Sequence, residues 1–107
     1  MMDEKEFMQN ITELAVKSED IRSFIQQNQN SFKSNNLDTK TKELIALGCA
    51  IVSRCEYCIR AHLRNLIENG VTEGEIIDTL NVATTMAGGP GLAYSTLTYK
   101  LYKEMKK

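Results

Sequence analysis

Hydrophobic side chains recur at intervals of three and four residues along almost the whole chain, which is the spacing of a helix with one buried face. A first helix is predicted from about Asp3 to Lys17, with apolar positions at Phe7, Ile11, Leu14 and Ala15. Ser18 can cap a second helix, whose apolar face carries Ile21, Phe24 and Ile25. The segment from Gln26 to Asn36 is rich in Asn, Gln and Ser, so we predict a loop there.

The next predicted helix is apolar nearly all round. It begins after Asp38, a suitable cap, and runs to Ile51 or Val52. Its apolar residues are Leu44, Ile45, Leu47, Cys49, Ile51 and Val52. Such a helix is buried on most sides, and a chain this short has few elements to cover it, so we expect homo-oligomerisation. Cys49, between Gly48 and Ala50, is expected to be a small buried core residue.

Three further helices complete an all-α pattern of about six. One begins near Cys55 and runs to Asn69, and Gly70 follows in the position of a left-handed cap. Thr72 and Glu75 form a capping box for the next helix. Its apolar stripe is Ile76, Ile77, Leu80 and Ala83, and it stops at Gly88-Gly89-Pro90-Gly91. The last helix carries Leu92, Tyr94, Leu97, Leu101 and Tyr102. Strand signals are nearly absent.

The 107 residues fit a single helical domain, residues 1–107, with N-terminal helices in 1–36 and a core in 37–104. With 42% hydrophobic residues, 25% charged residues and a net charge of −1, the composition is that of a globular protein without a nucleic-acid-binding surface. The longest apolar run, Leu44 to Val52, is too short to span a membrane. The acidic start, Met1 to Glu6, is unlike a secretory signal, so we expect a cytoplasmic location and no membrane partner.

The cysteines are the first candidates for chemistry. Their number, three, does not suit a closed disulfide framework, and in the cytoplasm a close pair is more typical of catalysis or metal binding. Cys55 and Cys58 form a Cys-x-x-Cys at a predicted helix start. Unsatisfied N–H groups and the helix dipole stabilise an anion there, which favours the reactive thiolate. The spacing lets the two sulfurs meet, so the pair can cycle between dithiol and disulfide.

His62 is the only histidine in the chain. It lies four residues after Cys58 on the same helix face, where its imidazole can take a thiol proton near neutral pH. If its helix and the preceding one form a hairpin about Ser53-Arg54, Glu43 and His62 both lie roughly 10–14 Å from the turn, at ~1.5 Å per residue. His62 would then be the partner that a carboxylate in a mostly apolar helix needs. The alternative is a solvated Glu43 on a polar face that also carries lysines.

The order of these residues is also a family signature. Glu43, eleven residues, Cys55-x-x-Cys58, three residues and His62 resemble the active-site signature of the alkylhydroperoxidase D-like proteins of the carboxymuconolactone decarboxylase superfamily. The segments Gly70 to Ile77 and Met86 to Pro90 are also similar to that family, and the likeness covers about Leu37 to Tyr102. It implies a single-repeat, all-helical fold, a homo-oligomer that is often a trimer or hexamer, and reduction of hydroperoxides or disulfides without a cofactor or metal.

The resemblance also implies a role for each residue. Cys58 matches the peroxide-attacking cysteine, Cys55 the resolving cysteine, His62 the proton acceptor and Glu43 the carboxylate that relays the proton. An external dithiol would restore the pair. One position departs from the pattern, because Tyr57 stands where the best-known members carry a second histidine that assists the first cysteine.

Two other functions remain open from the sequence. One is a cofactor-free decarboxylase acting on a lactone acid, a reaction that does not need the cysteine pair. The other is a non-catalytic interaction module stabilised by zinc, with Cys55, Cys58, His62 and Glu43 as ligands. Structural zinc sites usually draw their ligands from two separated pairs, whereas three of these four come from one predicted helix.

Overall fold

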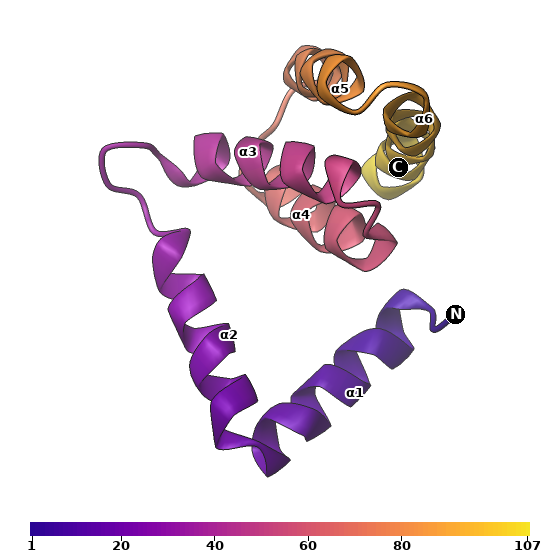
Figure 1. Ribbon diagram of the computed structural model, residues 1–107. Coiled ribbons are helices and arrows are strands. Elements are labelled where there is room, and N and C mark those ends of the chain that lie inside the picture. Colours follow the sequence, from indigo (N-terminus) through magenta and orange to yellow (C-terminus); the bar gives the residue numbers. More distant parts are fainter.

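The computed structural model describes residues 1–107 and contains six helices and no strand, as predicted (Figure 1). The helices are α1 (Glu4–Lys17), α2 (Glu19–Ser31), α3 (Thr39–Val52), α4 (Glu56–Glu68), α5 (Glu73–Ala87) and α6 (Gly89–Lys106). Helices α3 to α6 pack together, whereas α1 and α2 form a V that stands away from them. No helix is both long and apolar enough to cross a lipid bilayer.

Three helix starts follow the caps predicted at Ser18, Asp38 and Thr72, and Asp3, expected as the first helical residue, is the cap of α1. Asp3, Ser18 and Asp38 each accept the backbone N–H of the residue three positions on, at 2.8, 3.2 and 2.7 Å. Thr72 and Glu75 close a reciprocal capping box at 3.1 and 2.9 Å. These bonds lower the pKa values of the Asp38 and Glu75 carboxyls, since hydrogen bonds from Thr41 and Thr72 favour the ionised forms.

The predicted loop from Gln26 to Asn36 is wrong in its first half, because α2 continues to Ser31. The polar residues of this segment lie on an exposed helix surface, where Asn, Gln and Ser lower helix propensity only modestly. A contact from another helix satisfies the carbonyls near its end. The Lys42 ammonium donates to the carbonyl oxygens of Ser31 and Lys33 at 2.9 and 2.7 Å.

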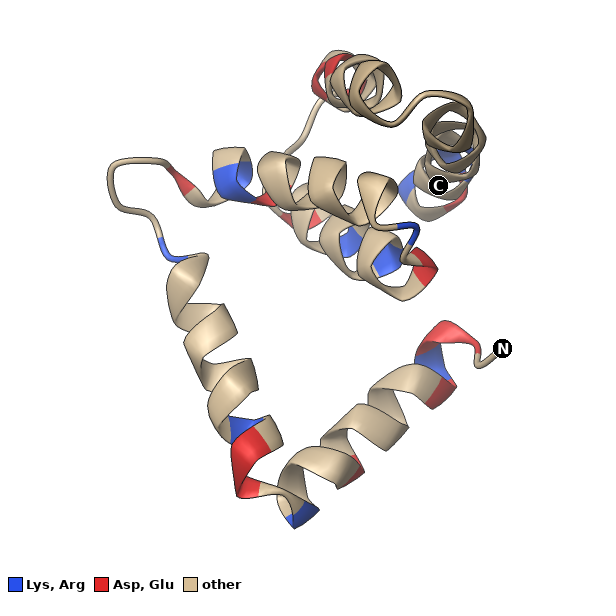
Figure 2. Ribbon diagram, in the orientation of Figure 1, with Lys and Arg blue, Asp and Glu red and all other residues tan.

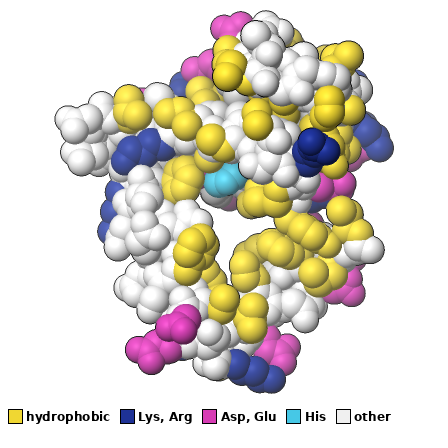
Figure 3. All heavy atoms as spheres, in the orientation of Figure 1, with side chains coloured by type: hydrophobic (Ala, Val, Ile, Leu, Met, Phe, Trp, Pro, Cys, Tyr) yellow, Lys and Arg dark blue, Asp and Glu magenta, His cyan; other side chains and the backbone are white.

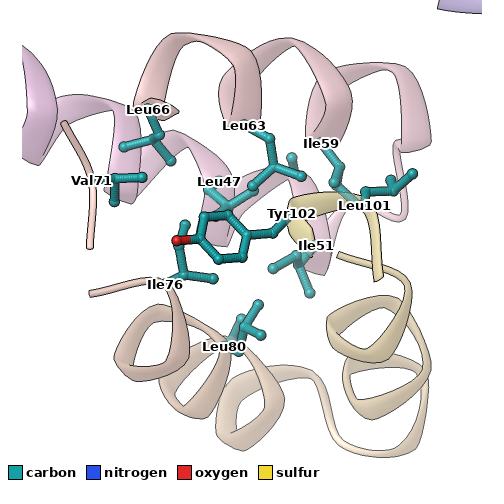
Figure 4. Packing of buried hydrophobic residues seen from close by; sticks show 12 residues of the cluster. Leu47, Ile51, Ile59, Leu63, Leu66, Val71, Ile76, Leu80, Leu101 and Tyr102 are labelled. Atoms are coloured by element: carbon teal, nitrogen blue, oxygen red, sulfur yellow. The ribbon is translucent and has the colours of Figure 1, made fainter. Parts of the chain in front are cut away.

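The hydrophobic core lies among α3, α4, α5 and α6 (Figure 4). Its largest apolar side chains with almost no exposed surface are Leu47, Ile51, Ile59, Leu63, Leu66 and Ile76. Helices α5 and α6 join at Gly88, which has a positive φ of 70°. The two helices come close together at Gly91, where a Cβ would lie 2.8 Å from the Ala87 Cβ and 3.1 Å from the Ala83 carbonyl oxygen.

Cys49 is exposed, so the prediction of a buried core residue was wrong. Helices α4, α5 and α6 cover only part of α3. The side of α3 that carries Ile45, Cys49 and Val52 has no helix over it, and Ile45 is 53% exposed. Helical periodicity shows that α3 is apolar all round, but it does not show which side the neighbouring helices leave open.

Helices α1 and α2 bury no residue. Helix α2 packs along α1 and touches α3 through the Lys42 hydrogen bond to Ser31, and α1 packs against α2 and α4. The start of α1 is tied to α4 by Glu4, whose carboxylate accepts two hydrogen bonds from the Arg64 guanidinium at 2.7 and 3.1 Å. The N-terminal helices are therefore held by a few contacts rather than by the core.

Replacing Gly91 by alanine should destabilise the fold, because the added methyl would overlap Ala87 at the α5–α6 junction. We expect Gly91→Ala to lower the free energy of unfolding by about 1–3 kcal/mol in urea denaturation. Gly89→Ala is the matched control, since a Cβ there meets nothing within 4 Å. Equal stability of the two variants would contradict the close approach.

The Glu4–Arg64 pair should make the stability depend on pH. Hydrogen bonding to Arg64 lowers the pKa of the Glu4 carboxyl below its ordinary value of 4.5. The pair's contribution is therefore full above that value and disappears as pH falls through the lowered pKa. Arg64→Gln should be less stable than the parent at pH 7, with a difference that vanishes in acid. Thermal unfolding of both proteins between pH 7 and pH 2 measures this, and a constant difference would refute it.

Candidate functional site

The Cys55–Cys58 pair lies where α3 turns into α4. Helix α3 ends at Val52, and Arg54 adopts a left-handed conformation with a φ of 56°. The Cys55 N–H then donates to the Ala50 carbonyl at 3.0 Å, which fixes the start of the next helix. Cys55 is the N-cap of α4 rather than its first helical residue, and its Sγ accepts the Cys58 N–H at 3.2 Å. Cysteine sulfur thus occupies the position that an Asp or Ser oxygen usually takes.

Cys55 and Cys58 are joined by a disulfide bond. Cys58 is exposed, whereas Cys55 is half-buried. An external reagent therefore has freer access to the sulfur of Cys58. A thiolate on Cys55 would be stabilised by the N-terminal N–H groups of α4.

Glu43 and His62 meet between α3 and α4, as the hairpin geometry predicts. The Glu43 carboxylate is 3% exposed, and its Oε2 lies 2.7 Å from the His62 Nδ1. Because an ionised carboxylate only accepts hydrogen bonds, Nδ1 carries the hydrogen and Nε2 keeps a lone pair for another proton. The alternative of a solvated Glu43 is therefore wrong.

Two neighbours of this pair were not identified from the sequence. The Asn65 side-chain amide donates to the other Glu43 oxygen at 3.2 Å, so both carboxylate oxygens have partners. The Phe32 ring lies 5.5 Å from the His62 ring, centroid to centroid. Asn65 stands three residues after His62, a helical spacing that could have been noticed. Phe32 lies thirty residues away and leaves no local signal.

A cavity of about 990 Å³ lies between the V of α1 and α2 and the helices α3 and α4. Glu43, Cys58 and His62 contribute to its wall. Figure 3 shows this opening, bordered by hydrophobic side chains, with the histidine at its edge. The apolar part of the wall comes mainly from the N-terminal helices, through Phe7, Met8, Ile11, Ala15, Val16 and Ile25. The cavity can therefore hold an apolar molecule beside the cysteine pair.

The structure does not support a zinc site formed by these residues. No three His, Cys, Asp or Glu side chains lie together in an arrangement that could hold a metal ion. Glu43 has both oxygens engaged by His62 and Asn65. The four residues are arranged as a hydrogen-bonded acid–imidazole pair beside a disulfide.

The model of the carboxymuconolactone decarboxylase family matches residues 22–98. The chain belongs to this family. The matched segment includes all four candidate residues, Glu43, Cys55, Cys58 and His62, together with α3 to α5 and most of α2 and α6. The family includes both alkylhydroperoxidase D-like peroxidases and decarboxylases, so membership alone does not assign the reaction.

Two uncharacterised proteins are similar to this chain in sequence, and solved structures agree with the family assignment. An uncharacterised protein of the cox locus of Paracoccus denitrificans is 31% identical over 69% of this chain and 67% of its own length. One from Methanocaldococcus jannaschii is 37% identical over 62% of this chain and 64% of its own length. A solved family protein from Legionella pneumophila has a TM-score of 0.92 and 31% identity, covering 96% and 93% of the two chains.

A second solved member of the family comes from Thermotoga maritima. Its TM-score is 0.83 and its identity 27%, with 94% of this chain and 89% of that chain covered. That protein is described with a suggested part in the antioxidative response. Both solved relatives cover nearly the whole chain, so the arrangement of the N-terminal helices is shared with them as well as the core.

Proposed function

We propose that the protein is a thiol-dependent antioxidant enzyme that reduces hydroperoxides or disulfides through Cys55 and Cys58, with His62 and Glu43 relaying the proton. The observation that carries the proposal is that the exposed Cys58 and His62 line one cavity, and that a buried carboxylate holds His62. The suggested antioxidative part of the relative from Thermotoga maritima supports the same class of reaction.

The first step uses the reduced pair. His62 Nε2 takes the proton of the Cys58 thiol, and Glu43 stabilises the resulting imidazolium through Nδ1–H. The thiolate attacks one peroxide oxygen, so an S–O bond forms and the O–O bond breaks. The alkoxide that leaves takes the proton from His62, which yields an alcohol and a sulfenic acid on Cys58.

The second step regenerates the state seen in the structure. The Cys55 thiol attacks the Cys58 sulfur, the S–S bond forms, and the S–O bond breaks to release water with the Cys55 proton. An external dithiol then attacks the more exposed Cys58 sulfur and is itself oxidised to a disulfide. Cys55 leaves as a thiolate at the N-terminus of α4, where the Cys58 N–H already faces its sulfur. If the protein is cytoplasmic, reductants that keep thiols reduced are present in the same compartment.

Hydroperoxide consumption with dithiothreitol as the reductant tests this function. Cys58→Ser should reduce the rate to background, because serine forms no thiolate. His62→Gln should lower it by about 10²–10⁴-fold, the usual contribution of a positioned base. Cys49→Ser is the matched control: this third cysteine lies exposed on α3, outside the cavity, and its loss should leave the rate within twofold of the parent.

Equal rates in the parent and Cys58→Ser would disprove the thiol mechanism. Decarboxylation of a carboxymuconolactone that survives replacement of both Cys55 and Cys58 would assign the protein to the decarboxylase branch instead.

A second copy of the chain is the partner that we propose for the uncovered side of α3. An apolar groove of about 680 Å³ runs between α3 and α5, lined mainly by Leu44, Ile45, Val52, Val82 and Met86. The chain exposes 7047 Å², about 1000 Å² more than the ~6000 Å² typical of a 12.1 kDa monomer. This excess includes the V of α1 and α2, which buries no residue, so the exposed apolar lining of the groove carries the proposal for α3.

Light scattering should therefore report a homo-oligomer, a trimer or hexamer if the chain follows its family. Val82→Glu places a charge on this groove, at a side chain that is 64% exposed in the single chain, and should shift the mass towards the monomer. Leu92→Glu is the control, because Leu92 is similarly exposed but lies outside the groove. A monomeric parent would overturn the proposal.

A further inference from the structure

The first turn of α1 is fastened to α4 beside the cysteine pair. The Phe7 and Tyr57 rings stack with centroids 4.6 Å apart and planes 9° from parallel. The Met2 N–H donates to the Tyr57 hydroxyl at 3.0 Å. The Glu4–Arg64 pair lies on the same two elements. Two of these three ties end on Tyr57, a residue enclosed within the Cys55–Cys58 disulfide ring.

These three contacts hold α1 in place, and α1 forms the N-terminal wall of the cavity. Phe7, Met8, Ile11 and Ala15 line the cavity from α1, yet α1 buries no residue and packs only against α2 and α4. Figure 1 shows α1 crossing from the apex of the V towards the end of α4 that carries the cysteines. If the first turn of α1 is released, the apolar wall opposite Cys58 is lost.

We propose that Tyr57 is a positioning residue that holds α1 across the cavity and thereby sets the preference of the redox site for bulky apolar substrates. Its ring supports Phe7, and both rings line the cavity that such a substrate would touch, so hydrogen exchange is the readout that isolates the positioning of α1. A hydrogen peroxide molecule is too small to depend on this wall.

The claim about substrate preference rests on the proposed peroxidase function, whereas the fastening of α1 does not. Two measurements on the full chain keep them apart. Amide hydrogen exchange reports the opening of residues 4–17. Steady-state kinetics with cumene hydroperoxide and with hydrogen peroxide, both with dithiothreitol, report the preference.

Tyr57→Ala should speed exchange in residues 4–17 by about tenfold or more, with amides of α3 to α6 unchanged. The same variant should raise the KM for cumene hydroperoxide more than it changes kcat. The kcat/KM for cumene hydroperoxide, divided by that for hydrogen peroxide, should fall by about tenfold. Tyr57→Phe keeps the stacked ring and should restore most of both readouts. Phe24→Ala is the control: this ring is 64% exposed on α2, lies outside the cavity wall, and should change neither readout.

Unchanged hydrogen exchange of residues 4–17 in Tyr57→Ala would refute the claim that Tyr57 holds α1 against α4. Faster exchange with an unchanged substrate ratio would overturn the link to substrate preference. If the parent consumes neither peroxide, the proposed function fails while the exchange result still decides whether Tyr57 holds α1.

Discussion

The hydrogen bond between Glu43 and His62 is the interaction on which the rest of the site depends. A carboxylate that is almost fully buried is unfavourable unless its oxygens are paired, and here His62 and Asn65 pair both of them. The two partners lie on α4 and the carboxylate on α3, so the pair fixes how far the helices slide past each other. Cys58 lies one helical turn before His62 on α4 itself, so the pair with Glu43 holds the imidazole in orientation while the helix sets its spacing from the sulfur. A shift of one residue along either helix would leave a buried charge unpaired.

The turn between α3 and α4 places the two cysteines at the start of α4. Arg54 has a positive φ, and the Cys55 N–H donates to the Ala50 carbonyl, so the connection between the helices is short. Helix α4 therefore begins directly after Cys55, whose side chain caps it. Cys55 serves as the cap and Cys58 as the exposed sulfur of the first turn. The two cysteines are therefore chemically unequal for a structural reason: one faces the helix N–H groups and the other faces the cavity.

Features encoded by local sequence were predictable, and those that depend on distant segments were not. Caps at Ser18, Asp38 and Thr72 follow from side chains that reach backbone groups three residues away. Glu43 and His62 could be paired because a short turn fixes the register of two adjacent helices. The length of α2 was missed because Lys42, on α3, satisfies the carbonyl of its last residue, Ser31. The exposure of Cys49 was missed because it depends on where α4, α5 and α6 lie around α3.

Helices α3 to α6 form a packed core, whereas α1 and α2 are held by few contacts. This difference lets one small chain hold its redox residues in fixed positions while access to them can vary. Glu43, His62 and both cysteines lie on or beside α3 and α4, which share a core whose large side chains are fully buried. The apolar wall opposite them comes from α1, which is held by an aromatic stack worth ~0.5–1.5 kcal/mol beyond its buried area and by an exposed ion pair worth ~0–1 kcal/mol. Opening α1 therefore requires far less free energy than unfolding the core. Because α1 carries none of the four redox residues, its movement can change which molecules reach Cys58 while the distance between Glu43 and His62 stays the same.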